Sequence, residues 1–197
     1  MKKSFSAITC AFALTLLTAA GAHAQSNDRT TSIPSDIAVP SDAVLFLVGH
    51  GFGTQNYVCL PSGTGVAYSL FTPEATLFND GSHQLITHFF SPNPEEKGTI
   101  RATWEHSRDS SMVWAAATGQ VSVRDDSILW LRLEVKGTAA GPTGGRTLTP
   151  TKFIQRINTV GGLAPATGCS SAADVGTKAF VPYAADYLFY KLPAEKQ

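Results

Sequence analysis

Residues that could carry chemistry fall on two adjoining segments of the 197-residue chain. His88 lies in the first segment, and Trp104, His106 and Asp109 lie in the second. If His88 faces inward on one strand and residues 100–106 alternate on its neighbour, then His88, Trp104 and His106 line one semi-apolar cavity. A histidine, the Asp109 carboxylate and the hydroxyls that follow it would permit acid–base or nucleophilic chemistry.

The same residues also have a purely structural interpretation. A buried histidine can pack beside a tryptophan with its polar atoms hydrogen-bonded, and an aspartate can cap a turn. The sequence favours this second interpretation. No catalytic residue is therefore assigned, and His88, His106 and Asp109 remain candidates.

The histidines give no sequence signature of a metal site. Beyond residue 24 the imidazoles are His50, His83, His88 and His106, and no H-x-H pair places two of them on one face of a strand. We expect no metal ion and no cofactor, although a site assembled from several strands stays open.

Residues 49–53, Gly-His-Gly-Phe-Gly, superficially resemble a dinucleotide-binding loop. The strand-like residues 55–60 follow, whereas a pyrophosphate needs the N-terminus of a helix at that point. We interpret this segment as a glycine-rich connection between two strands.

Short strand-like segments separated by turn residues must position the candidate side chains, since no segment has the length and periodicity of an amphipathic helix. Residues 100–106 and 129–136 alternate most clearly between apolar and polar side chains, as half-buried strands do. The pattern predicts an all-β, single-domain antiparallel sandwich or partly closed barrel of about nine strands. The expected strands are residues 44–48, 54–60, 66–71, 84–90, 99–106, 112–117, 128–136, 152–159 and 187–192.

Residues 153–159 break the alternation, because Gln155, Arg156 and Asn158 cannot all share one solvent-facing side. At least one of them should be half-buried and hydrogen-bonded. We expect Arg156 to anchor the long loop 161–177, and we take it, with Trp104, as a candidate binding residue.

Residues 1–24 have the pattern of a secretory signal peptide. Lys2 and Lys3 precede an apolar stretch, and an A-x-A cleavage site ends at Ala24. A flexible leader of residues 25–40 and one β domain of residues 41–192 would follow. This pattern predicts a periplasmic or secreted protein.

Export would determine which of the three cysteines the mature protein keeps. Cys10 leaves with the signal peptide, so Cys59 and Cys169 remain in an oxidising compartment. We predict that they form one disulfide bond, which would close most of the domain into a single covalent loop.

Charge and hydropathy exclude several classes of partner. The chain has 15 basic and 15 acidic side chains, with no basic cluster that would bind nucleic acid or an anionic membrane. No segment after the signal peptide has the apolar length of a transmembrane helix. A small apolar or carbohydrate-like ligand near Trp104 remains a possible partner.

Several longer motifs resemble a family of exported bacterial and fungal proteins, the domain of unknown function 3455. The matching elements are G-x-Q-x-Y-x-C at 53–59, Pro73-Glu74-Ala75, His88, Trp104 with 109–111, and the segments 154–162, 164–165, 168–169 and 181–190. Ser110 stands where the family pattern has glycine. The resemblance implies an exported domain with a Cys59–Cys169 bridge, and it implies no reaction.

Together these patterns predict an exported β domain that is a binding or structural protein of the envelope or the extracellular space. The alternative is a small hydrolase-like or metal-assisted enzyme that uses a cavity formed by His88, Trp104, His106 and Asp109.

Overall fold

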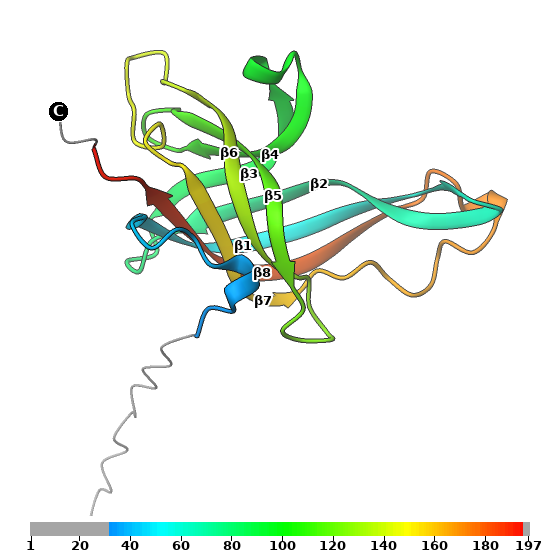
Figure 1. The fold of residues 1–197 in the computed structure, drawn as a ribbon. Coiled ribbons are helices and arrows are strands. Elements are labelled where there is room, and N and C mark those ends of the chain that lie inside the picture. The colour runs from blue at the N-terminus through cyan, green and yellow to red at the C-terminus, as the bar shows by residue number, and fades with distance from the viewer. Residues whose placement is uncertain (1–31, 195–197) are drawn as a thin grey trace, which may run out of the picture. The chain divides into compact units, whose positions relative to one another are not determined.

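Eight antiparallel strands form a closed barrel in the computed structural model, which describes residues 32–194 (Figure 1). Each strand pairs with the next one along the chain, and the last pairs with the first. The strands are β1 (Val44–Ser62), β2 (Gly65–Phe78), β3 (Gln84–Asn93), β4 (Thr99–His106), β5 (Met112–Val121), β6 (Trp130–Ala139), β7 (Phe153–Gly161) and β8 (Lys178–Lys191). The predicted all-β antiparallel class is confirmed, and the barrel is fully closed.

One predicted connection is wrong, because residues 49–53 lie inside β1. Two of the nine expected strands are therefore parts of one long strand. The glycines are needed for close packing rather than for a turn. A side chain at Gly51 would begin 2.9 Å from the Tyr187 ring, and one at Gly53 would begin within van der Waals overlap of the Glu74 carbonyl oxygen.

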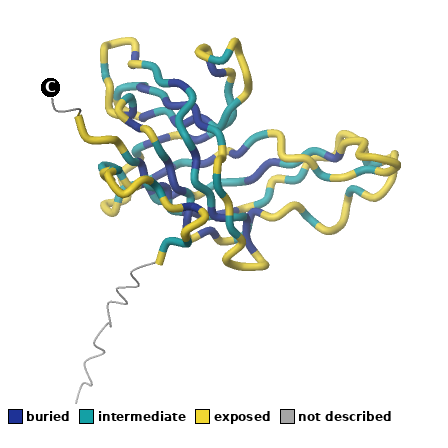
Figure 2. Tube along the Cα trace, in the orientation of Figure 1, coloured by how far each residue is buried: buried dark blue, intermediate teal, exposed yellow. Residues whose placement is uncertain are grey.

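Alternation places apolar side chains inside the barrel. Figure 2 shows the buried residues, in dark blue, recurring along its strands. On β4, Trp104 is 1% exposed and Ala102 packs beside it. On β6, Leu131, Leu133 and Val135 face the same core, as the sequence pattern predicts. The inner face of the barrel is thus the hydrophobic core of the domain.

The compact unit begins at Ile33, and the short 3-10 helix Ser35–Ile37 packs against the outside of the barrel. Ile37 is fully buried beside Trp130 and Ile157. Gln155 donates a 2.6 Å hydrogen bond to the Ile37 carbonyl. This contact explains why residues 153–159 do not alternate, since Gln155 is buried beneath the segment. The predicted signal peptide lies outside the described residues.

Beyond the barrel, β1 and β2 continue as a long hairpin beside the first part of β8, drawn at the right of Figure 1. The loop after β7 runs along this extension and is fixed to it. Cys59 and Cys169 form the predicted disulfide bond, and backbone hydrogen bonds join Cys59 to Thr177 and Gly176. The Tyr57 hydroxyl also donates to the Gly162 carbonyl over 2.7 Å. The bridge therefore ties the longest loop to the strand that closes the barrel.

Replacing both Cys59 and Cys169 by alanine should lower the free energy of unfolding. The two residues are 110 positions apart, and a bridge across so long a loop stabilises by up to about 5 kcal/mol in the chain-entropy account. Denaturant titration measures the loss, and the reduced parent protein, in which the same bond is broken without a substitution, should match the double variant. Superimposable unfolding curves for the parent and the double variant would contradict this prediction.

Candidate functional site

A cavity of about 550 Å³ opens into the barrel and is lined by side chains from the inner faces of its strands. Most of the lining is apolar and much of it is small. The apolar residues include Leu70, Pro73, Phe90, Ala102, Ala115, Leu131 and Leu133, and the polar or aromatic ones include Gln55, Tyr57, His88, Trp104, Arg156 and Tyr187. The cavity therefore combines an apolar wall with a few polar groups.

His88 and Trp104 form the centre of this wall. Strand pairing places His88 directly opposite Trp104, and their rings stack with centroids 4.3 Å apart and planes 9° apart. Tyr187 of β8 packs against both rings, at 5.3 Å from His88 and 5.9 Å from Trp104. The inward orientation that the sequence pattern requires of His88 and Trp104 is present.

The protonation state of His88 follows from its contacts. Its Nδ1 lies 2.8 Å from the Thr103 carbonyl oxygen, which can only accept, so Nδ1 carries the proton. Burial lowers the pKa of His88 to about 3, against the opposing effect of that hydrogen bond. The ring is thus neutral at pH 7 and its Nε2 has a free lone pair, for which the described residues supply no hydrogen-bond donor.

Arg156 also lies on the inner face, where it pairs with Leu131 on one side and Tyr187 on the other. Its Nε and Nη2 donate to the Leu129 carbonyl, at 3.2 and 2.9 Å. The expectation that Arg156 anchors loop 161–177 is therefore wrong, because it holds the segment that leads into β6. Leu129 comes close enough because residues 127–129 fold back beside β7.

His106 and Asp109 are also close together, but in a different arrangement. His106 Nδ1 lies 3.0 Å from Asp109 Oδ1, which also accepts from the Ser111 backbone and hydroxyl. Asp109 Oδ2 accepts from the backbone and hydroxyl of Thr147. Despite desolvation, the hydrogen bonds from Ser111 and Thr147 keep the pKa of Asp109 well below its usual range. The carboxylate thus joins the β4–β5 turn to the loop before β7.

This turn includes the position where the chain differs from the family pattern. Ser110 has φ 52°, in the left-handed region that favours glycine. The neighbouring loop packs so tightly that a side chain at Gly145 would overlap Asp109. The hydrogen bonds of Asp109 hold this strained turn in place. Within the described residues, no hydrogen bond connects His88 to His106 or to Asp109.

Sequence reasoning missed Gln55 and Tyr187 as lining residues. The available signal was the alternation of Tyr183, Ala185, Tyr187 and Phe189, which places all four on the inner face of β8. For Gln55 no such signal exists, because a polar residue beside glycines resembles a turn.

Residues 32–194 contain neither a metal-binding cluster nor a membrane-spanning helix. They contain no cluster of three or more histidine, cysteine or carboxylate side chains arranged to hold a metal ion. Among the same residues, none of the helices has the length and apolar character needed to cross a membrane.

Fold and site together define a closed, eight-stranded antiparallel β barrel with one disulfide and a ligand-sized internal cavity. Residues 40–191 match the family described as "Protein of unknown function (DUF3455)", and the chain belongs to that family. Comparison with curated proteins and with solved structures gives no significant match.

The buried state of His88 predicts a specific pH dependence of stability. Its pKa is about 3 in the folded protein and about 6.5 in an unfolded chain. Between these values the unfolded state binds more protons, so the contribution of His88 to stability is complete above pH 6.5. It is lost as the pH falls towards 3, by up to about 1.4 kcal/mol per pH unit.

Urea titrations between pH 7 and 4 should therefore show a steeper loss of stability in the parent than in His88→Phe, which keeps a stacked ring but cannot be protonated. NMR supplies an internal comparison, because hydrogen bonds to Asp186 and Asp80 raise the pKa of His50. At pH 5.5, His50 should be charged and His88 neutral with its proton on Nδ1. Equal pH slopes in both proteins, or a charged His88 ring, would contradict this.

Proposed function

We propose that this protein binds a small, predominantly apolar molecule inside the barrel, beside Trp104. The observation that carries the proposal is the cavity itself. Its volume of about 550 Å³ lies within the range of about 300–1,000 Å³ that is typical of small-molecule sites. An eight-stranded barrel is also just wide enough to enclose one small ligand when its interior is not filled.

The interior is not filled because the chain has small residues where a packed barrel would have large ones. Ala115, Ala116 and Ala117 follow one another on β5 and all line the cavity, and Ala102 lies opposite Ala115 on β4. The rings of Trp104 and His88 lie on the adjoining strands, because Trp104 is two residues from Ala102 on β4 and His88 of β3 pairs with Trp104. A flat apolar group in the cavity would cover the exposed part of its lining, at Ile100, Ala117 and Leu163, and so bury surface that is now open to water.

Access to the cavity lies at one end of the barrel. Ile100 and Leu163 line the cavity and are 56% and 42% exposed, and Ala117 is also exposed. These residues come from the start of β4, the loop after β7 and the second half of β5. A ligand can therefore pass between them without opening the barrel.

A neutral fluorescent probe, N-phenyl-1-naphthylamine, tests this proposal. The purified protein should bind it with increased emission, and Ala117→Phe should weaken binding about tenfold or more by narrowing the opening, a loss of at least about 1.4 kcal/mol. Val123→Phe is the matched control, because Val123 is exposed but does not line the cavity. Absence of probe binding to the parent protein, or equal weakening by both variants, would overturn the proposal.

We also propose that the protein works after export, in the periplasm or outside the cell. The Cys59–Cys169 bond supports this, because such bonds persist in oxidising compartments. The sequence pattern of residues 1–24 supports it as well. An exported binding protein would meet its ligand outside the cytoplasm.

Expression in the source cell, followed by N-terminal sequencing of the accumulated protein, tests the export proposal. The mature chain should begin at Gln25. Replacing Ala22 and Ala24 by bulky residues should block cleavage at this position and leave a longer precursor. A cytoplasmic product that retains Met1 or begins at Lys2 would contradict it.

A further inference from the structure

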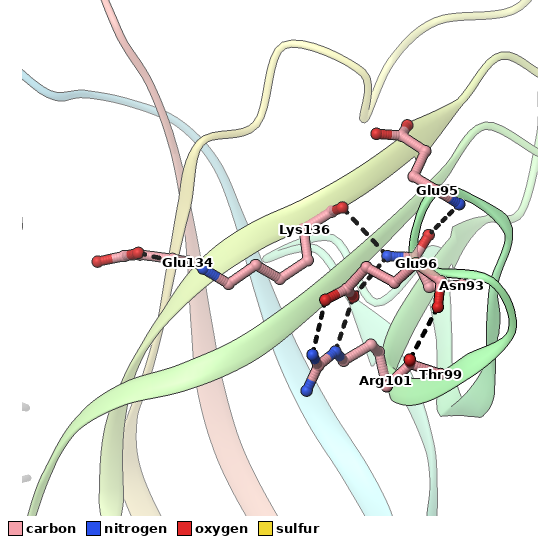
Figure 3. A network of polar contacts seen from close by, with 7 residues as sticks. All are labelled: Asn93, Glu95, Glu96, Thr99, Arg101, Glu134 and Lys136. Atoms are coloured by element: carbon pink, nitrogen blue, oxygen red, sulfur yellow. Dashed lines mark hydrogen bonds and ion pairs between the residues drawn. The ribbon is translucent and has the colours of Figure 1, made fainter.

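Two arginines line the cavity, and none of the side chains that line it is a carboxylate. The charge of the first arginine, Arg101, is balanced by a carboxylate. It donates two hydrogen bonds to Glu96, from Nε over 2.8 Å and from Nη2 over 2.7 Å, as the dashed lines in Figure 3 show. Asn93 holds the same carboxylate over 2.8 Å, and these bonds from Arg101 and Asn93 lower the pKa of Glu96 to about 2.

The second arginine, Arg156, has no comparable partner. Its Nε and Nη2 donate to a neutral carbonyl group, that of Leu129, and the guanidinium also contacts the neutral Tyr187 hydroxyl. In the described part of the chain no carboxylate forms an ion pair with it. Because an uncompensated charge is costly on a half-buried, largely apolar wall, the positive charge of Arg156 favours an anion inside the cavity.

Polar groups of neighbouring residues lie on the same wall. Trp104 Nε1 has no hydrogen-bond partner, in a side chain that is 1% exposed. The amide of Gln55, which is 2% exposed, interacts with the Tyr183 hydroxyl and opposes the burial that raises the pKa of that group. Trp104 and Gln55 both line the cavity, as does Tyr187, which pairs directly with Arg156 across the strands. Because the Trp104 nitrogen has almost no accessible surface, Arg156 is the polar group on this wall that a ligand would reach directly.

We propose that the ligand is an amphiphile with an anionic head group, a carboxylate or a phosphate, held by Arg156 while its apolar part lies along Trp104 and the alanines of β5. This inference rests on the proposed function and specifies its ligand class. The planar guanidinium matches a bidentate anion. His88 is neutral and contributes no charge, so Arg156 alone sets the electrostatic preference.

The test compares ligands that differ only in the head group. Dodecanoate, dodecyl phosphate and dodecanol each displace N-phenyl-1-naphthylamine from the purified protein at pH 7.5, below their micellar concentrations. The parent should prefer at least one anion over dodecanol by about 10- to 100-fold, as charge-assisted hydrogen bonds contribute. The better of the two anions identifies the head group.

Arg156→Gln should abolish this preference while the affinity for the neutral probe is retained, and Arg156→Lys should restore part of it. Arg101→Gln is the matched control, because it removes an equal charge at the same cavity but one already neutralised by Glu96. It should keep the preference. Equal affinity of the parent for dodecanol and both anions would overturn this inference, and so would a preference that survives in Arg156→Gln.

The two failures are distinguishable. If the neutral probe and dodecanol bind but the anions gain nothing, the head-group inference is wrong and the proposed apolar site stands. If the probe, the alcohol and both anions all fail to bind, the proposed function is wrong, and the head-group inference fails with it.

Discussion

The structure depends on the pairing of one long strand with two neighbours. β1 hydrogen-bonds to β2 along one edge and to β8 along the other, so it joins the first and last strands of the chain into a cylinder. This closure brings Gln55 and Tyr187, which are far apart in sequence, to the same wall as His88. It is possible only because glycines at 51 and 53 let the Tyr187 ring and the backbone of β2 approach. The cavity exists because the sheet is closed around it.

Closure also fixes the electrostatics of the interior. Once the cylinder is sealed, His88 is removed from water and stays neutral, with its proton committed to the Thr103 carbonyl. Arg156 cannot lose its proton in the same way, because guanidinium remains charged at any pH a protein meets. The interior therefore holds a neutral acceptor at His88 and a fixed positive charge at Arg156, and the proposed head-group preference rests on this combination.

Much of the fold follows from local patterns in the sequence. Residues 99–106 form the strand that the alternation predicts, with the same bounds, and His88 and Trp104 face inward together. The disulfide follows from the count of cysteines and the predicted compartment. Neither prediction requires the order of the strands in the sheet. Alternation is visible within a single strand, and the disulfide argument uses only composition and redox environment.

The remaining errors arise where a tertiary contact decides the outcome. Residues 49–53 look like a turn because glycine is common in turns, but the Tyr187 ring that requires a glycine at position 51 is more than 130 positions away in the sequence. The partner of Arg156 was misassigned for the same reason. The broken alternation indicates that at least one of Gln155, Arg156 and Asn158 is buried. Which one it is depends on a distant contact, because Gln155 is buried where Ile37 covers the outer face of β7.

Two half-buried charges illustrate the difference between structural and functional polar groups. Asp109 is surrounded by donors from Ser111, Thr147 and His106, so its charge is fully used in holding a strained turn. Arg156 lies at a similar depth but meets only neutral groups, the Leu129 carbonyl and the Tyr187 hydroxyl. A charge that is hydrogen-bonded and paired within the fold needs no further partner. An uncompensated charge on a cavity wall lowers the free energy of unfolding, and a bound anion would restore it. Binding of that anion would therefore stabilise the barrel itself, and this coupling connects the site to the fold that encloses it.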